Sequence, residues 1–102
     1  MSAAHLDPAG DGHFRLAGVL SFATVPGLWQ QTRGLFAGQA AVKIDLRGVE
    51  RSDSAGLALL VEWMREAERH KTRLQFVNMP SQMLAIARVS GLDHILPLSR
   101  EE

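Results

Sequence analysis

The chain has 102 residues, of which 46% are hydrophobic, and its 11 basic residues balance 11 acidic residues. A chain of this length forms one ordinary domain that can fold around its own core without a metal or a disulfide. The absence of cysteine excludes thiol catalysis, cysteine-bound zinc and disulfide bonds, and the neutral charge balance gives no reason to expect nucleic acid or an anionic membrane surface as a partner.

The first twelve residues, 1–12, are rich in Gly, Pro and Asp and show no periodicity, which predicts a flexible leader. The folded domain is therefore expected to span residues 13–102. The leader lacks the apolar core of a secretory signal, and no apolar run in the chain approaches the ~20 residues of a membrane span. The sequence predicts a soluble protein that stays where it is made.

The first part of the domain is expected to contain two strands and a helix. Apolar residues on either side of Gly18 predict two short strands over 14–22, joined by a tight bend at the glycine. Thr24 is a favoured N-cap residue and Pro26 is favoured in a first turn, so a short amphipathic helix is expected to begin after Thr24 and to contain Leu28, Trp29, Gln31, Thr32, Leu35 and Phe36.

The stretch 42–60 carries the strongest local pattern in the chain. Its first part alternates, which predicts a strand whose buried face is formed by Val42, Ile44 and Leu46. Its last part predicts a helix over 54–70, and the apolar stripe of this helix consists of Leu57, Leu60, Val61, Met64 and Ala67. The solvent-exposed face of the same helix is expected to carry Glu62, Arg65, Glu66 and Arg69.

The remaining elements follow in alternation. Residues 73–78 predict a strand that stops before Pro80, because proline cannot donate to a strand ladder. A third helix is expected from Ser81 to Gly91, which fits a left-handed C-terminal cap, and the tail 92–98 forms a last apolar patch. The order β-β-α-β-α-β-α predicts an α/β domain with a sheet that is at least partly parallel.

A short polar turn, residues 51–54, lies between the central strand and the second helix. The backbone N–H groups at a helix start are unpaired, and the helix dipole favours an oxygen there. Ser54 is therefore expected to present its hydroxyl to a partner, beside free N–H groups of Ala55 and Gly56, and Gly56 has no side chain to keep the partner away. Since the sequence has no P-loop, metal cluster or Gly-rich dinucleotide turn, this site favours binding over catalysis.

The residues of this stretch resemble those of the STAS domain, a module of sulfate transporters and anti-sigma factor antagonists. The resemblance rests on Asp45-Leu46, Gly48-Val49 and Asp53-Ser54-Ala55-Gly56-Leu57, and it covers about 14–98. It implies a single STAS domain, with a mixed β-sheet and α-helices packed mainly on one face.

A finer likeness comes from the segments 53–63, 76–82 and 87–92, which are similar to the small STAS subunit of the Mla system. This system is an ABC transporter that moves phospholipid between the two membranes of Gram-negative bacteria and serves outer-membrane lipid asymmetry. The resemblance implies a cytoplasmic protein, peripheral to the inner membrane, that binds and regulates the transporter's ATPase. It implies no cofactor, no small-molecule substrate and no direct membrane insertion. The expected partner-binding residues are Arg51, Ser52, Asp53, Ser54, Ala55, Gly56, Leu59 and Trp63.

Three roles for the polar turn remain open from the residues themselves. Ser54, Ser52 or Asp53 can simply cap the helix; Ser54 can contact a partner; or Ser54 can be phosphorylated, as the equivalent serine is in anti-sigma factor antagonists, which is the alternative function. The family resemblance favours the contact. Ser21 also favours the transporter branch, because the antagonists commonly have an aspartate at that position.

Leu59 and Trp63 lie outside the main apolar stripe of the second helix, so they form either a half-exposed contact pair or a pair covered by a neighbouring helix. An enzyme would need Ser54 to act with a histidine and with Asp45 or Asp53, but the flanking residues do not form a Gly-x-Ser-x-Gly elbow. The 4 histidines show no metal-ligand spacing. The sequence therefore predicts neither an enzyme nor a metal site.

Overall fold

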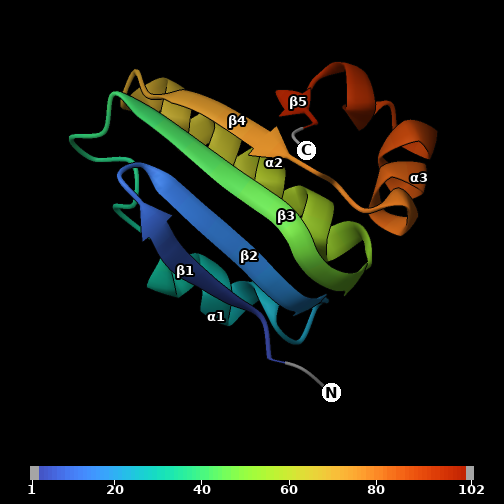
Figure 1. Cartoon of the computed structure of the whole chain (residues 1–102). Coiled ribbons are helices and arrows are strands. Elements are labelled where there is room, and N and C mark those ends of the chain that lie inside the picture. Colours follow the sequence, from blue (N-terminus) through green and yellow to red (C-terminus); the bar gives the residue numbers. More distant parts are fainter. Residues whose placement is uncertain (1–2, 101–102) are drawn as a thin grey trace.

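The computed structural model describes residues 3–100, so residues 1–2 of the predicted leader and 101–102 of the predicted domain lie outside it. Within this range the chain forms a five-stranded sheet and three α-helices (Figure 1). The elements in chain order are β1 (His5–Gly10), β2 (His13–Leu20), α1 (Val25–Gln31), β3 (Ala41–Ser52), α2 (Ser54–Arg69), β4 (Arg73–Val77), α3 (Ser81–Val89), a 3-10 turn (Leu92–His94) and β5 (Leu98–Ser99).

The sheet has the strand order β1-β2-β3-β4-β5. The first two strands form an antiparallel hairpin, and the pairs β2–β3, β3–β4 and β4–β5 are parallel. Parallel neighbours need crossover connections, which α1, α2 and α3 supply. Figure 1 shows α1 and α2 on one side of the sheet and α3 at the end where β3 and β4 finish. The predicted mixed α/β fold with helices mainly on one face is confirmed.

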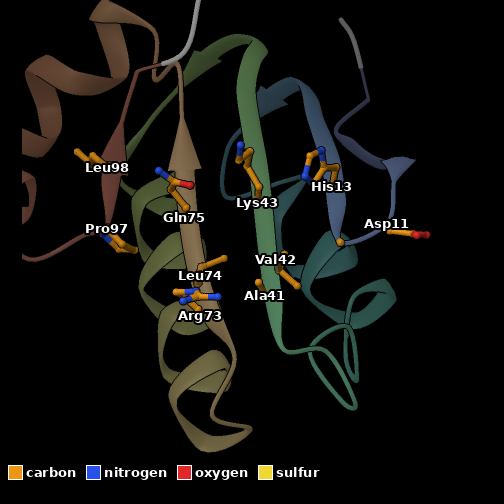
Figure 2. A pocket seen from close by; sticks show the side chains of 11 residues that line it. Asp11, His13, Ala41, Val42, Lys43, Arg73, Leu74, Gln75, Pro97 and Leu98 are labelled. Atoms are coloured by element: carbon orange, nitrogen blue, oxygen red, sulfur yellow. The ribbon is translucent and has the colours of Figure 1, made fainter.

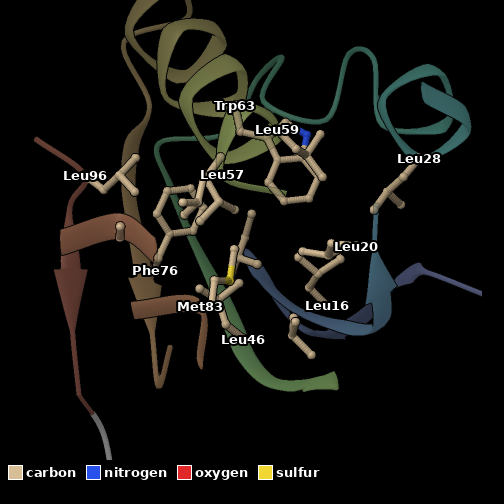
Figure 3. Close-up of a cluster of buried hydrophobic side chains, with 14 of the residues drawn as sticks. Leu16, Leu20, Leu28, Leu46, Leu57, Leu59, Trp63, Phe76, Met83 and Leu96 are labelled. Atoms are coloured by element: carbon tan, nitrogen blue, oxygen red, sulfur yellow. The ribbon is translucent and has the colours of Figure 1, made fainter. Parts of the chain in front are cut away.

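The core lies between the sheet and the two helices behind it (Figure 3). Val42, Ile44 and Leu46 are buried as the alternation of β3 predicts, and they pack against the buried side of α2. Each large apolar side chain removed from water in this way contributes about 1.5–3 kcal/mol. The residues between them, such as Lys43 and Asp45, point to the opposite face of the sheet, which α1 and α2 do not cover.

The prediction of a flexible leader over 1–12 is wrong for residues 5–10, which form β1. This edge strand pairs with β2, so that Leu6 lies opposite Leu16 and packs against the core. The sequence of β1 does not show the apolar–polar alternation that is typical of a strand, because most of its side chains are exposed and one of its residues is Pro8. Proline is tolerated here since an edge strand leaves one side of its backbone unpaired.

The tight bend predicted at Gly18 is also absent, because β2 runs without interruption from His13 to Leu20. Gly18 instead adopts a φ of 97° where the register with β3 shifts, and a Cβ atom there would collide with the backbone carbonyl of Ala3. The glycine therefore marks an irregularity inside one strand, where a positive φ is cheap only for a residue without a side chain.

Two other elements differ from expectation. Helix α1 begins after Thr24, with Pro26 in its first turn, as predicted. It ends at Gln31, earlier than predicted, because the Thr32 hydroxyl donates to the Leu28 carbonyl and Gly34 turns the chain away with a φ of 84°. The apolar tail contains the short strand β5, which extends the sheet beside β4. The remaining helices α2 and α3 match their predictions, including Gly91 in the left-handed region with a φ of 73°.

Candidate partner-binding site

Ser54 is the first residue of α2 and its side chain is exposed. Strand β3 runs on through Ser52, so the predicted four-residue turn shrinks to Asp53 alone. Among residues 3–100, no hydrogen bond engages the Ser54 hydroxyl. The structure thus places this hydroxyl on the surface at the start of the helix, as expected.

Asp53, not Ser54, caps the helix. It has an extended backbone with ψ of −167°, and its Oδ1 accepts from the Ala55 amide at 2.8 Å. Its carbonyl oxygen accepts from the Gly56 amide at 3.1 Å. The expectation of free N–H groups at Ala55 and Gly56 is therefore wrong: Asp53 satisfies both, which leaves no open anion site at this helix start.

Ser52 is buried and works inside the fold, with 1% of its surface exposed. Its hydroxyl donates to the Asp53 carbonyl at 2.9 Å. The side chain of Gln82, in α3, forms two hydrogen bonds with the backbone of Ser52. Its Oε1 accepts from the Ser52 amide at 2.9 Å, and its Nε2 donates to the Ser52 carbonyl at 2.8 Å. These bonds fix the end of β3, and they place Ser52 under the surface where a partner does not reach its side chain.

Gly56 is also an internal contact. A Cβ atom on it would collide with the Ser52 hydroxyl and lie 2.8 Å from the Leu20 Cβ atom. The glycine is thus required for the close approach of α2 to the ends of β2 and β3, and the prediction that it leaves room for a partner is wrong.

We expect Gly56→Ala to lower the free energy of unfolding by about 1–3 kcal/mol, because the added methyl group overpacks this contact. Gly27→Ala in α1 is the matched control, since nothing lies within 4 Å of its Cβ position; it should be neutral or stabilising by up to about 1 kcal/mol. Urea unfolding of both variants measures the difference. Equal free energies of unfolding for the two variants would contradict this account of Gly56.

The interpretation of Leu59 and Trp63 as a half-exposed contact pair is wrong. Leu59 is 2% exposed and Trp63 is fully buried. The Trp63 indole nitrogen donates to the Thr32 hydroxyl at 3.0 Å, just past the end of α1. The other interpretation holds, because a neighbouring segment covers the pair.

The residues that we group with Ser54 come from four places: the segment after β2, helix α1, strand β3 and helix α2. Strands β2 and β3 are parallel and Leu20 pairs with Ser52, so the residues that follow the two strands emerge side by side. Phe22 follows β2 and is 74% exposed. Arg51 is exposed near the end of β3, and Ala58 is exposed one turn after Ser54 on α2, where it lines one groove together with Pro26 and Trp29 of α1. We call Phe22, Pro26, Trp29, Arg51, Ser54 and Ala58 the Ser54 surface.

A groove of about 230 Å³ runs between α1 and α2, and its lining includes Ala58, which lies one helical turn after Ser54. It is mostly apolar, and its lining residues are Val25, Pro26, Trp29, Ala58, Leu59 and Glu62. Sequence reasoning missed Phe22, Pro26 and Ala58 as surface residues of the site. Nothing in their local pattern distinguishes an exposed apolar side chain from a buried one.

The family follows from a comparison with known domains. The family model described as "Mlab, STAS domain" matches residues 6–97, nearly the whole chain. The chain belongs to this STAS domain family. The match begins within β1, so the first strand is part of the STAS domain and not of a leader.

Known STAS proteins of two kinds are similar to this chain. The intermembrane phospholipid transport system binding protein MlaB of Haemophilus influenzae is 34% identical over 82 residues, which cover 76% of this chain and 77% of that protein. A chain of the Acinetobacter MlaFEDB complex in an ATP-bound conformation aligns with a TM-score of 0.74 and 26% identity, covering 85% of this chain and 93% of that one. An anti-sigma factor antagonist from Mycobacterium paratuberculosis aligns with a TM-score of 0.76 and 25% identity, covering 96% and 85%.

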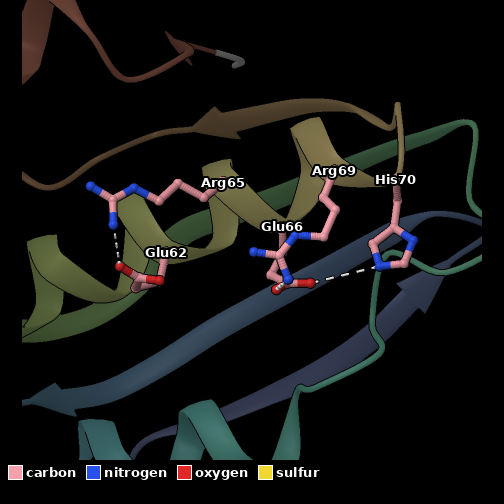
Figure 4. A network of polar contacts seen from close by, with 5 residues as sticks. All are labelled: Glu62, Arg65, Glu66, Arg69 and His70. Atoms are coloured by element: carbon pink, nitrogen blue, oxygen red, sulfur yellow. Dashed lines mark hydrogen bonds and ion pairs between the residues drawn. The ribbon is translucent and has the colours of Figure 1, made fainter.

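The outer face of α2 in this STAS domain is polar, as predicted (Figure 4). Arg65 contacts Glu62 at 2.9 Å, and Arg69 contacts Glu66 at the same distance. Exposed pairs of this kind contribute only about 0.3–0.5 kcal/mol each. They keep the outer face of α2 hydrated, which confines the apolar part of the helix surface to the groove beside α1.

Proposed function

We propose that this chain is the non-catalytic STAS subunit of an Mla-type phospholipid transporter, and that it binds and supports the transporter's cytoplasmic ATPase. The 34% identity to a phospholipid transport binding protein carries the proposal. The likeness to a chain inside the MlaFEDB complex supports membership of a multi-subunit transporter.

The Ser54 surface has the physical properties of a docking site. Phe22 and Trp29 offer aromatic area beside a neutral hydroxyl, and aromatic residues are common anchors in protein interfaces. The neighbouring polar groups of Asp53 and Ser52 are already paired within the chain. A partner therefore meets a rigid surface that costs little to order, which favours affinity.

The surroundings of Ser54 support binding over catalysis. The carboxylate of Asp53 is directed to the Ala55 amide, away from any role as a base. Within residues 3–100, no histidine hydrogen-bonds to the Ser54 hydroxyl. A serine nucleophile needs such a base within reach, so this site favours a hydroxyl that is contacted but does not react.

We place the protein in the cytoplasm, at the inner face of the inner membrane, through its contact with the ATPase. None of the helices within residues 3–100 is long and apolar enough to cross a bilayer. Its attachment to the membrane would then depend on the complex alone.

The test is co-expression of the tagged chain with the ATPase, permease and lipid-binding subunits of the Mla-type transporter of the same organism. We expect the ATPase to co-purify, and the ATP hydrolysis rate of the assembled transporter to fall when the chain is left out. An ATPase that assembles and hydrolyses ATP equally well without the chain would contradict the proposal.

The alternative is an anti-sigma factor antagonist controlled by phosphorylation of Ser54. The TM-score of 0.76 to the mycobacterial antagonist and the exposed, unbonded hydroxyl favour it. Incubation with the serine kinase of the same organism and ATP, followed by mass spectrometry, separates the two functions. A stoichiometric phosphate on Ser54 and binding to an anti-sigma factor would favour the antagonist, and an unmodified protein bound to the ATPase favours the transporter.

A further inference from the structure

A hollow of about 490 Å³ lies on the sheet face that α1 and α2 leave open (Figure 2). It sits where β2, β3 and β4 begin, whereas Ser54 follows the other end of β3. The polar residues that line it and matter here are His13, Lys43, Arg73 and Gln75.

Two small residues create the hollow. Ala41, the first residue of β3, lies on the floor of the hollow, and its short side chain leaves this space open. Gly12 turns the β1–β2 hairpin close over β3 with a φ of 68°, and a Cβ atom there would lie 2.6 Å from the Ala41 carbonyl oxygen. Pro97 and Leu98 form an apolar wall on the other side. The space is therefore built by the backbone and does not depend on how one long side chain folds.

Strand register brings the polar groups together. His13 pairs with Lys43 and Lys43 pairs with Gln75, so the three side chains form one row across three strands. Arg73 lies two residues before Gln75, on the same face of β4, and pairs with Ala41. Figure 2 shows the carboxylate of Asp11, at the rim, directed away from this row.

The charged residues that line the hollow are Lys43, Arg73 and, at the rim, Asp11, so its net charge is positive although the chain is neutral overall, with 11 basic and 11 acidic residues. Within residues 3–100, neither His13 nor Arg73 takes part in an ion pair. The side-chain Nε2 of Gln75 donates to the Ser99 hydroxyl at 2.6 Å. This bond fixes the side-chain amide and leaves its Oε1 as an acceptor. The hollow thus offers cationic donors, one fixed acceptor and an apolar wall.

We infer that this hollow binds the phosphate group of a small phosphate ester. A guanidinium fork matches the oxygens of a phosphate, and donors that approach from several strands suit a tetrahedral anion better than a planar carboxylate. Gln75 can accept from a hydroxyl of the ester, and Leu98 can contact its carbon part. This inference goes beyond the proposed function, because the hollow and the Ser54 surface lie at different ends of β3.

The experiment follows backbone amide shifts of the ¹⁵N-labelled full chain at constant ionic strength. One arm adds inorganic phosphate and then glycerol 3-phosphate; the other adds phosphatidylcholine vesicles with or without phosphatidic acid. We expect saturable shifts at Gly12, Lys43 and Gln75.

Arg73→Gln should weaken binding by about tenfold, because it removes a charge-assisted contact. Arg88→Gln on α3 removes the same charge away from the hollow and should leave binding unchanged.

Ala41→Leu provides a second variant that fills the floor without changing any charge, and it should also weaken binding. Saturable shifts in the soluble arm identify a free phosphate ester as the ligand, and shifts only with phosphatidic acid identify a lipid headgroup; each supports the inference. The absence of saturable shifts at these amides in both arms would overturn it. Equal weakening by Arg73→Gln and Arg88→Gln would also overturn it, since that result indicates unspecific charge attraction.

Discussion

Replacing Ser54 with arginine is expected to abolish co-purification with the transporter ATPase while the STAS domain stays folded. The side chain is exposed and unbonded within the described chain, so a larger residue meets no internal contact. In the complex, however, it would occupy the centre of the Ser54 surface. Arginine in the first turn of α2 should cost only about 0.3–1 kcal/mol of stability through the helix dipole.

Ser54→Glu makes this test sharper. A carboxylate at the same position interacts favourably with the dipole, so its effect on stability has the opposite sign to that of arginine. Both variants should nevertheless lose the ATPase, because both put bulk and charge where a neutral hydroxyl fits. Loss of the partner in both variants therefore separates binding from folding.

The matched control is Ser90→Arg, the same substitution at an exposed serine that follows α3. We expect it to co-purify with the ATPase as the unchanged chain does. Pull-down of the ATPase by Ser54→Arg at the level of the Ser90→Arg control would count decisively against a contact centred on Ser54.

Replacing Trp63 with alanine should produce the largest loss of stability among single substitutions of the apolar residues. The indole is fully buried between α2 and the end of α1, and its removal leaves a cavity of the kind that costs about 3–5 kcal/mol. For a domain of this size the midpoint of thermal unfolding should fall by more than about 12 °C. Circular dichroism melting of the purified variant measures the shift.

Two further variants tell whether Trp63 acts through folding or through contact. Trp63→Phe keeps most of the apolar volume but removes the donor to the Thr32 hydroxyl, so it should lose about 1–2 kcal/mol and still bind the ATPase. Trp29→Ala, in the half-exposed wall of the groove, should show the reverse pattern of a smaller loss of stability and weaker binding. A folded Trp63→Phe protein that fails to bind would restore the direct-contact interpretation.

The sequence predicts the centre of this fold well because its elements bury one face each. Strand β3 alternates between the core and the open face of the sheet, and the apolar stripe of α2 includes the buried Leu57 and Leu60. These periods are physical consequences of one-sided burial, so they are visible in a single chain. From β3 to α3 the order of the elements followed from them, whereas the two strands predicted over 14–22 are the single strand β2, and β1 and β5 were not predicted as strands.

The errors arose where burial depends on a distant segment. Leu59 and Trp63 are covered by α1 and by the residues after it, so α2 is buried over a wider arc than one stripe. Strand β1 gains its structure from pairing with β2 and from the Asp11-Gly12 turn, and its own exposed residues show no alternation. Neither fact can be derived from local patterns, because each depends on tertiary neighbours.

The place of Ser54 in the fold was predicted, but the contacts of the residues around it were not. The sequence placed an exposed Ser54 at a helix start, which the structure confirms. It could not choose among Ser52, Asp53 and Ser54 as the cap, because that choice depends on the backbone angles of one residue. The cap at Asp53 engages the amides of Ala55 and Gly56, so the hydroxyl of Ser54 and the apolar side chains of the Ser54 surface are what we propose a partner contacts.

Site-specific photocrosslinking tests the central claim most directly, namely that the Ser54 surface meets the ATPase. A benzoylphenylalanine replaces Ala58 in one variant and Gln75, on the open face of the sheet, in another. After irradiation of the assembled transporter, the account predicts a crosslink to the ATPase from position 58 and none from position 75. A crosslink from position 75 with none from position 58 would contradict it.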